Sequence, residues 1–269
     1  MNRKIFRGVK IVVLVYCVLG IALFYLQNVF LFHPEALPRN YKYKFDVPFE
    51  ETEIALNKTD TFSLVKFFPV GKTPKGVVLY FHGNRTNINR YAQFMSVFTS
   101  RNYEVWMGDY PGFGKSTGER TEENMYAQAD QLYRLALSAY GKDSIIFYGK
   151  SLGTGVATYL ASREQGKQLI LETPYYSIPG IFACYAPIYP VSRMIHFKLP
   201  SNEYLPDVAA PVTIFHGTDD GVIPYRCAER LKQFLKPGDR FITIEDGSHH
   251  DLGNFPQYRQ TMDSLLRVP

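Results

Sequence analysis

Hydrophobic residues along the chain fall into short β-like runs that alternate with longer amphipathic ones. The stretches at residues 87–100, 121–140, 152–163, 224–235 and 256–266 look amphipathic, so we expect helices there. Two β-like runs come first, as in a hairpin, and the others alternate with helices, which predicts an α/β fold with a mostly parallel central sheet flanked by helices. The expected strands are TEIAL, FSLVKFF, GVVLYFH, YEVWMGD, SIIFYG, QLILE, PVTIFHG and RFITIE.

Residues 173–209 interrupt this alternation. They contain six prolines among aromatic residues, and prolines at that density exclude long helices and strands. Long irregular insertions in compact domains are usually functional, so we expect a short lid folded over the top of the sheet, where ligands bind at the strands' carboxyl ends. A structural crossover without a ligand role is the alternative. The prolines are Pro174, Pro179, Pro187, Pro190, Pro200 and Pro206.

An apolar run of 22 residues without a charge covers residues 11–32. As a helix it would be about 33 Å long, enough to cross a hydrocarbon core. The chain continues with HPEALPRN, which does not resemble a signal-peptide cleavage site. We therefore expect a membrane anchor at residues 1–33, a linker at 34–49 and a catalytic domain at 50–269; a buried or cleaved helix is the alternative.

The cations near this run are distributed unequally. By the positive-inside rule, a single-pass anchor would leave the N-terminus in the cytoplasm and the globular part on the outer side. Cysteines do not settle the compartment, because Cys184 and Cys227 could either pair or remain free thiols. The cations before the run are Arg3, Lys4, Arg7 and Lys10, and those after it, Arg39, Lys42 and Lys44, are diluted by Glu35 and Asp46.

Length and composition are those of an ordinary globular protein. The chain has 269 residues, enough for one large domain, with 46% hydrophobic and 20% charged residues. The net charge of +5 is mild and arises partly ahead of the apolar run. We therefore expect no nucleic-acid partner.

Two pentapeptides fit the GxSxG pattern of a serine nucleophile: GKSTG around Ser116 and GKSLG around Ser151. The pattern is informative only where the serine lies between a strand and a helix. Ser151 lies there, whereas a glycine-rich loop separates Ser116 from its strand. Neither site has the further glycine that a phosphate-binding loop requires, and the absence of a YxxxK pair disfavours a dehydrogenase. Lys150, beside the nucleophile, is expected to be solvated.

A serine nucleophile needs an imidazole to take its proton and a carboxylate to orient that imidazole. Asp219 and Asp220 follow the expected strand PVTIFHG, and His249 and His250 follow the last strand. The order Ser, Asp, His is typical of α/β hydrolases. Spacing alone does not decide between the neighbouring residues in either pair.

Five ordered blocks resemble those of Bem46-like α/β hydrolases: YFHGN, GDYPGFGKSTG, YGKSLGTGVA, HGTDDGVIP and DGSHHDLGNF. The resemblance covers nearly the whole chain apart from the expected lid. It implies that the acid is Asp220, in GxxDxxxP, and the histidine His249, in GxHxD. Asp219 and His250 remain the alternatives, and His250 stands where relatives more often carry Asn.

The oxyanion that forms in acyl transfer needs two fixed donors. We expect the backbone N–H groups of Leu152, just after the nucleophile, and Asn84, in the turn after GVVLYFH. His82 and His216, which precede glycines at strand ends, are expected to be structural. No histidine cluster has metal-ligand spacing, so we expect neither a metal nor a cofactor.

Together these features predict a membrane-anchored serine hydrolase that cleaves carboxylic esters or thioesters through an acyl-enzyme on Ser151. The expected substrate is a small-molecule or lipid-like acyl compound, and no protein partner is identified. An amidase or peptidase with the same triad, or a non-catalytic binding scaffold on the hydrolase fold, are the alternatives.

Overall fold

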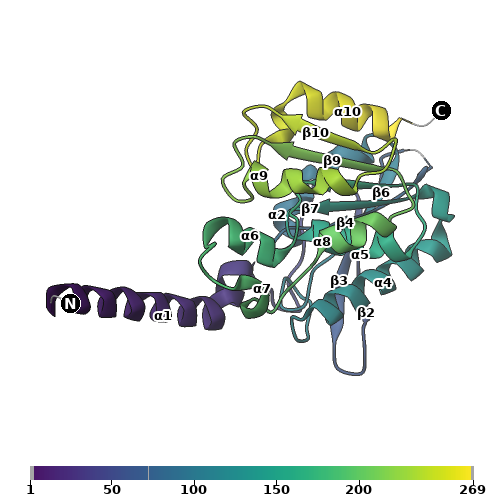
Figure 1. Cartoon of the computed structure of the whole chain (residues 1–269). Coiled ribbons are helices and arrows are strands. Elements are labelled where there is room, and N and C mark those ends of the chain that lie inside the picture. The colour runs from purple at the N-terminus through teal and green to yellow at the C-terminus, as the bar shows by residue number, and fades with distance from the viewer. Residues whose placement is uncertain (1–2, 72, 268–269) are drawn as a thin grey trace.

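The computed structural model describes residues 3–71 and 73–267 and centres on an eight-stranded sheet (Figure 1). The strand order is β10-β9-β8-β7-β4-β6-β3-β2; the strands from β10 to β6 pair in parallel, and β3 runs antiparallel to both neighbours. All eight expected strands form, and the mostly parallel sheet is confirmed. The bounds are β2 (Phe49–Ala55), β3 (Thr61–Phe67), β4 (Gly76–Phe81), β6 (Tyr103–Gly108), β7 (Ile145–Lys150), β8 (Gln168–Glu172), β9 (Val212–Gly217) and β10 (Arg240–Ile244).

Helices cover both faces of the sheet (Figure 1). The strands β4, β7, β8 and β9 are buried along their whole length, which explains why their sequences are almost continuously apolar. One face packs against α4 (Glu122–Ala139), α5 (Gly153–Arg163) and α9 (Tyr225–Ala228). The other packs against α2 (Ile88–Tyr91), α3 (Ser96–Thr99) and α10 (Pro256–Leu266).

Two of the five expected helices are broken into shorter pieces. Residues 88–99 form α2, a 3₁₀ turn at Ala92–Phe94 and α3, and α9 is followed by a 3₁₀ helix at Glu229–Phe234. Apolar residues three or four apart suit both α and 3₁₀ geometry. The hydrophobic pattern therefore located these segments but did not determine their hydrogen bonding.

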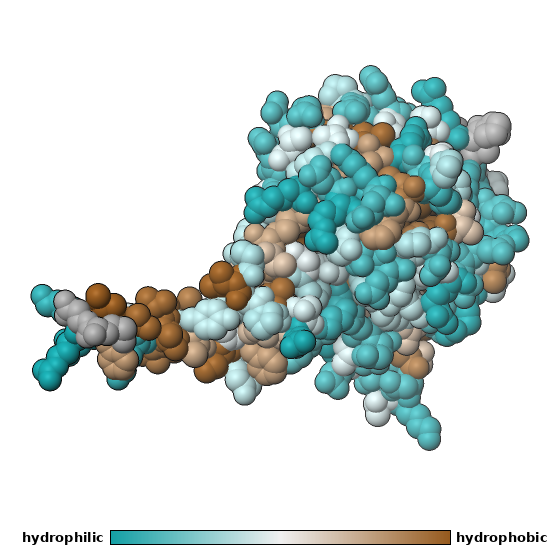
Figure 2. Space-filling model, in the orientation of Figure 1, coloured by the Kyte–Doolittle hydropathy of each residue, from teal (hydrophilic) through white to brown (hydrophobic). Residues whose placement is uncertain are grey.

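The helix α1 (Arg3–Leu31) extends away from the sheet (Figure 1). Its most apolar 18-residue window has a mean hydropathy of 2.5 and no buried residue, so it is long and apolar enough to cross a membrane. Figure 2 shows hydrophobic residues gathered along it. The expected apolar helix is thus present, while its membrane insertion, its orientation and the division into anchor, linker and catalytic domain stay predictions.

The segment after α1 is tied to the loops at the carboxyl edge of the sheet. The two-residue strand β1 (His33–Pro34) pairs in parallel with β5 (Arg85–Thr86). Further on, Leu37 N–H donates to the Gly114 carbonyl at 2.7 Å. Strands of two residues have no hydrophobic pattern, which is why the sequence did not predict this pairing.

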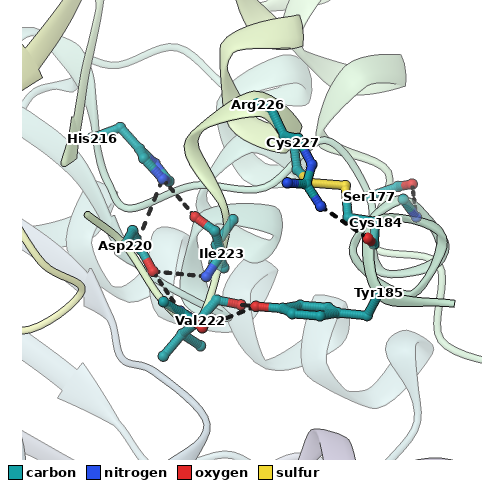
Figure 3. The surroundings of a disulfide bond; sticks show 11 residues. Ser177, Cys184, Tyr185, His216, Asp220, Val222, Ile223, Arg226 and Cys227 are labelled. Carbon is teal, nitrogen blue, oxygen red and sulfur yellow. Dashed lines mark hydrogen bonds and ion pairs between the residues drawn. A yellow bond between two sulfur atoms is a disulfide. The ribbon is translucent and has the colours of Figure 1, made fainter. Parts of the chain in front are cut away.

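Residues 173–209 contain only short helices among the described elements, as their prolines predicted: α6 (Ile178–Tyr185), α7 (Val191–Met194), α8 (Ser201–Tyr204) and a 3₁₀ turn at Leu205–Asp207. A disulfide joins Cys184 at the end of α6 to Cys227 in α9 (Figure 3). The Tyr185 hydroxyl donates to the carbonyl of Gly221 at 2.9 Å. The insertion is therefore fastened to the loop after β9, which carries Asp220.

Candidate active site

Ser151 occupies a tight turn between β7 and α5. Its φ of +51° is rare for a residue with a side chain and marks a locally strained backbone. Its N–H is held by the Glu172 carbonyl at 2.9 Å. The turn depends on Gly153, because a Cβ there would lie 2.0 Å from the Phe81 carbonyl oxygen. This geometry is typical of a nucleophile elbow.

A continuous hydrogen-bonded row links Ser151 to an imidazole and a carboxylate. His249 Nε2 lies 2.9 Å from Ser151 Oγ, and His249 Nδ1 lies 2.7 Å from Asp220 Oδ2. With its proton on Nδ1, the ring donates to the carboxylate and accepts from the serine hydroxyl. The three side chains are buried at the carboxyl ends of β7, β9 and β10. This arrangement can move a proton from serine to histidine.

The Asp220 carboxylate is held by its own loop. Its Oδ1 accepts the N–H groups of Val222 at 2.8 Å and Ile223 at 2.7 Å (Figure 3). Burial alone would raise the pKa of this carboxyl, but the hydrogen bond and charge of His249 and the N–H of Ile223 outweigh it, and the pKa is lowered. Asp220 therefore stays ionised and can orient the imidazole.

The neighbouring candidates, Asp219 and His250, lie outside this row. Both are exposed. Asp219 uses its backbone N–H, which donates to the Gly247 carbonyl at 3.0 Å, and the ring of His250 stacks edge-on against that of His249. The structure therefore brings Asp220 and His249 to Ser151; their catalytic roles stay a prediction.

The expected oxyanion donors, Leu152 and Asn84, both line a cavity that contains Ser151. Among the described residues, neither backbone N–H has a partner in a turn or loop, so both remain able to donate. The Asn84 side chain donates to the Leu31 carbonyl at 2.7 Å, and the Asn84 carbonyl accepts the His33 N–H at 2.9 Å. The end of α1 thus positions the Asn84 turn, a role for Leu31 that local sequence patterns do not signal.

His82 and His216 hold backbone groups beside the site, as expected. His82 Nδ1 lies 2.7 Å from the Gly83 carbonyl, and His216 Nε2 lies 2.9 Å from the Ile223 carbonyl. Burial lowers the pKa of His216, which keeps it neutral. Within residues 3–71 and 73–267, no group of three or more His, Cys, Asp or Glu side chains is placed to hold a metal ion.

The prediction that Lys150 is solvated is wrong. Lys150 is 6% exposed and pairs with Glu172, which also accepts hydrogen bonds from the hydroxyls of Tyr148 and Tyr258. Burial would raise the Glu172 pKa, but the charge and hydrogen bond of Lys150 outweigh it and the pKa is lowered. The strand register could have indicated this ion pair, because Lys150 and Glu172 are paired at the ends of the neighbouring parallel strands β7 and β8.

Two cavities flank Ser151. The first, which we call the cationic pocket, has a volume of about 250 Å³ and contains Arg85, Arg90, Lys150, His249 and His250 in its lining. The second, the apolar pocket, has a volume of about 160 Å³. Its lining includes residues from the end of α1, from α6 and from the loop after β9: Phe30, Leu31, Ile178, Ile181, Phe182 and Ile223.

Comparisons with known proteins agree with the α/β-hydrolase fold. The family model described as serine aminopeptidase, S33, matches residues 72–201. The mouse α/β hydrolase domain-containing protein 17C is 29% identical over 198 residues, covering 70% of this chain and 59% of that protein. The Caenorhabditis elegans α/β hydrolase domain-containing protein aho-3 is 30% identical over 200 residues, covering 70% of this chain and 57% of that protein. The matched part thus spans less than two thirds of these relatives.

Solved structures resemble the chain at lower identity. A Pyrococcus furiosus esterase has a TM-score of 0.68 at 15% identity, covering 88% of this chain and 97% of that one. The Paleococcus ferrophilus monoacylglycerol lipase has a TM-score of 0.57 at 18% identity, covering 76% and 98%. At such identities these likenesses show the fold alone.

A mostly parallel sheet with one reversed strand and a serine at a strand-to-helix turn defines the class of serine hydrolases with the α/β-hydrolase fold. The chain has the α/β-hydrolase fold and is similar to Bem46-like proteins, which include the α/β hydrolase domain-containing protein 17 group. The predicted fold and enzyme class are therefore confirmed, and so is the predicted resemblance to Bem46-like α/β hydrolases.

Proposed function

We propose that this protein is a membrane-anchored serine hydrolase that cleaves carboxylic esters or thioesters. The observation that carries the proposal is the row from Ser151 through His249 to Asp220, placed beside an apolar pocket. The parts needed for acyl transfer lie within hydrogen-bonding distance, and the adjoining pocket suits an acyl group.

The reaction follows from the roles of these residues. Ser151 Oγ attacks the acyl carbonyl while His249 Nε2 takes the hydroxyl proton, and Asp220 stabilises the imidazolium. The backbone N–H groups of Leu152 and Asn84 hold the oxyanion. His249 then donates its proton to the leaving oxygen or sulfur as the carbonyl bond to it breaks. Water, activated by the same imidazole, hydrolyses the acyl-enzyme and restores the serine.

The position of the apolar pocket supports a membrane-associated acyl substrate. Phe30 and Leu31, at the carboxyl end of α1, contribute to its wall. If α1 spans the membrane, this wall lies where the span ends, and an acyl chain could enter directly from the lipid. The disulfide between Cys184 and Cys227 supports an outer location for the catalytic domain, because disulfides persist in oxidising compartments.

An aminopeptidase activity is less compatible with the site. Such an enzyme binds a cationic amino terminus, which requires carboxylates or carbonyls near the nucleophile. The cationic pocket beside Ser151 is instead lined by Arg85, Arg90 and Lys150, with no Asp or Glu in its lining. This charge favours esters over peptides with a free amino terminus.

Labelling with a fluorophosphonate probe tests the proposal, since the probe reacts with an activated serine. Wild-type protein should label in a time-dependent manner, and Ser151→Ala should not label. Ser116→Ala is the matched control and should label like the wild type. Full labelling of Ser151→Ala, or none of the wild type, would refute the mechanism.

A further inference from the structure

The cationic pocket contains two arginines that have no counter-ion among the described residues. Arg85, in β5, and Arg90, in α2, line it together with Lys150 and His250. Lys150 is neutralised by Glu172, whereas neither arginine side chain forms an ion pair within the described parts of the chain. Since no carboxylate lines this cavity, its net charge is positive.

The neighbouring histidine responds to this charge. The pKa of His250 is lowered, first by partial burial, then by the electrostatic effect of His249 and by the positive charges of Lys150, Arg90 and Arg85. An arginine guanidinium presents a planar fork of donors that matches phosphate and carboxylate oxygens. Both arginines are exposed residues that line the pocket, so a ligand in it can reach their side chains.

The two pockets can be assigned to the two halves of an ester. The leaving group must lie beside the residue that protonates it, and His249 lines the cationic pocket but not the apolar one. The acyl half then occupies the apolar pocket, where Leu152 also lies. Both pockets contain Ser151 and Asn84, so the carbonyl carbon is at their junction.

We propose that the enzyme's substrate is an acyl ester whose alcohol half carries a phosphate group, and that Arg85 and Arg90 bind this phosphate. The inference rests on the proposed acyl-enzyme mechanism. Ser151 Oγ forms a bond to the acyl carbon, the bond from that carbon to the alcohol oxygen breaks, and His249 supplies the proton of the released phosphate-bearing alcohol. Water then releases the carboxylic acid, so no other reactant is needed.

Matched pairs of esters test this assignment in the full-length, detergent-solubilised protein. One pair is 1-butyrylglycerol with its 3-phosphate, which are soluble; the other is 1-oleoylglycerol with its 3-phosphate in neutral detergent micelles. Wild-type protein should prefer the phosphate ester by about tenfold to a hundredfold in kcat/KM, the range expected for hydrogen bonds to charged groups. A preference for the phosphate ester in both pairs indicates that the pocket binds the phosphate of a soluble substrate as well. A preference in the oleoyl pair alone indicates that it binds the phosphate of a lipid headgroup presented at a surface.

The double variant Arg85→Gln/Arg90→Gln should lose this preference mainly through a higher KM. Its activity on the uncharged ester should stay within about twofold of the wild type, because neither arginine touches the reacting atoms. Arg85→Lys/Arg90→Lys should restore part of the preference, and the exposed Arg134→Gln on α4 is the control for a general charge effect.

The outcomes separate this proposal from the one on which it rests. Equal kcat/KM values for the charged and uncharged esters in the wild type would overturn the phosphate assignment while leaving the hydrolase mechanism intact. A preference that the double variant keeps, or that Arg134→Gln also loses, would overturn the role of the two arginines. Loss of fluorophosphonate labelling and of all ester cleavage would instead refute the hydrolase itself.

Discussion

The turns GKSTG and GKSLG share four of five residues, yet their serines have opposite surroundings. Both serines are buried, Ser116 at 6% and Ser151 at 8% exposure. The Ser116 hydroxyl donates to the Asp109 carbonyl at 2.6 Å and accepts the Ser63 N–H at 3.0 Å, so its hydrogen-bonding capacity is used by the backbone. The Ser151 hydroxyl meets an imidazole instead.

The difference arises from where each turn places its positive φ. In GKSTG the glycines take it, Gly114 at +50° and Gly118 at +98°. In GKSLG the serine itself takes it at +51°, and its glycines serve close contacts with neighbouring backbone and side chains. Glycine adopts a positive φ at no steric cost. Serine does so with strain, and at Ser151 this backbone conformation points the hydroxyl into the candidate active site. The same residues thus form a structural turn in one place and a candidate nucleophile turn in the other.

Exchanging each serine for alanine should give the largest contrast. Ser151→Ala should lower kcat for an ester by at least about 10⁴-fold, because no other group replaces the nucleophile. Ser116→Ala should keep the activity of the folded protein but lower the free energy of unfolding by about 1–3 kcal/mol, since the buried Ser63 N–H loses its acceptor. Ester kinetics and thermal unfolding of both variants measure the two effects. An inactive but folded Ser116→Ala would contradict the comparison.

His249 and His250, adjacent in the loop after β10, should also differ in their effect on catalysis. His249→Ala should lower kcat by about 10³-fold or more, because Ser151 then lacks its proton acceptor. His250→Ala should leave kcat within severalfold, since its exposed ring makes no contact with Ser151. Kinetics near neutral pH distinguish them. A greater loss at His250 would reverse the assignment of the base.

The ion pairs of the two turn lysines should contribute unequally to the free energy of unfolding. Glu172→Gln leaves the buried Lys150 unpaired and should cost about 3–5 kcal/mol at neutral pH, whereas Lys115→Gln breaks a partly exposed pair with Glu51 and should cost about 1 kcal/mol or less. The lowered pKa of Glu172 means that its contribution is present above the ordinary glutamate pKa of 4.5 and is lost as pH falls below it.

Urea unfolding from pH 7 to pH 3 checks this prediction. The difference in free energy of unfolding between wild type and Glu172→Gln should decrease as the solution becomes acidic. A gap that is independent of pH would show that Glu172 does not act through its charge.

We expect the smallest effect on activity from the hydrogen bond that links the end of α1 to the Asn84 turn. Asn84→Ala keeps the backbone N–H but removes the hydrogen bond to the Leu31 carbonyl. A looser donor should lower kcat by about tenfold with little change in KM. Asn89→Ala, on α2, provides a control nearby. Unchanged kcat in Asn84→Ala would show that the end of α1 has no positioning role.

Much of the fold could be predicted because it depends on local patterns. The buried strands β4, β7, β8 and β9 are nearly all apolar, and the α4 face of Met125, Ala129, Leu132 and Ala136 is buried at the predicted spacing. The choice of Ser151 over Ser116 needed only the neighbouring strand and helix. The choice within each pair of neighbouring acids and histidines could not be made from local patterns, because a shift of one residue within a loop leaves no periodic signal. Only the family resemblance favoured Asp220 and His249.

The features that sequence reasoning missed all depend on contacts between distant segments. Lys150 looked like a solvated turn residue until the register placed Glu172 beside it. The pairing of β1 with β5 and the bond from Asn84 to Leu31 join residues more than fifty positions apart, and two-residue strands carry no pattern. Such contacts are decided by packing of the whole chain, which local propensity does not encode.

Trapping the acyl-enzyme shows directly whether Ser151 is the nucleophile. The protein is mixed with a slowly deacylating ester, quenched in acid during the first turnover, digested and analysed by mass spectrometry. We expect an acyl adduct on the peptide containing Ser151, none on the peptide containing Ser116, and none in Ser151→Ala. An adduct on Ser116, or ester turnover that persists in Ser151→Ala, would contradict this expectation.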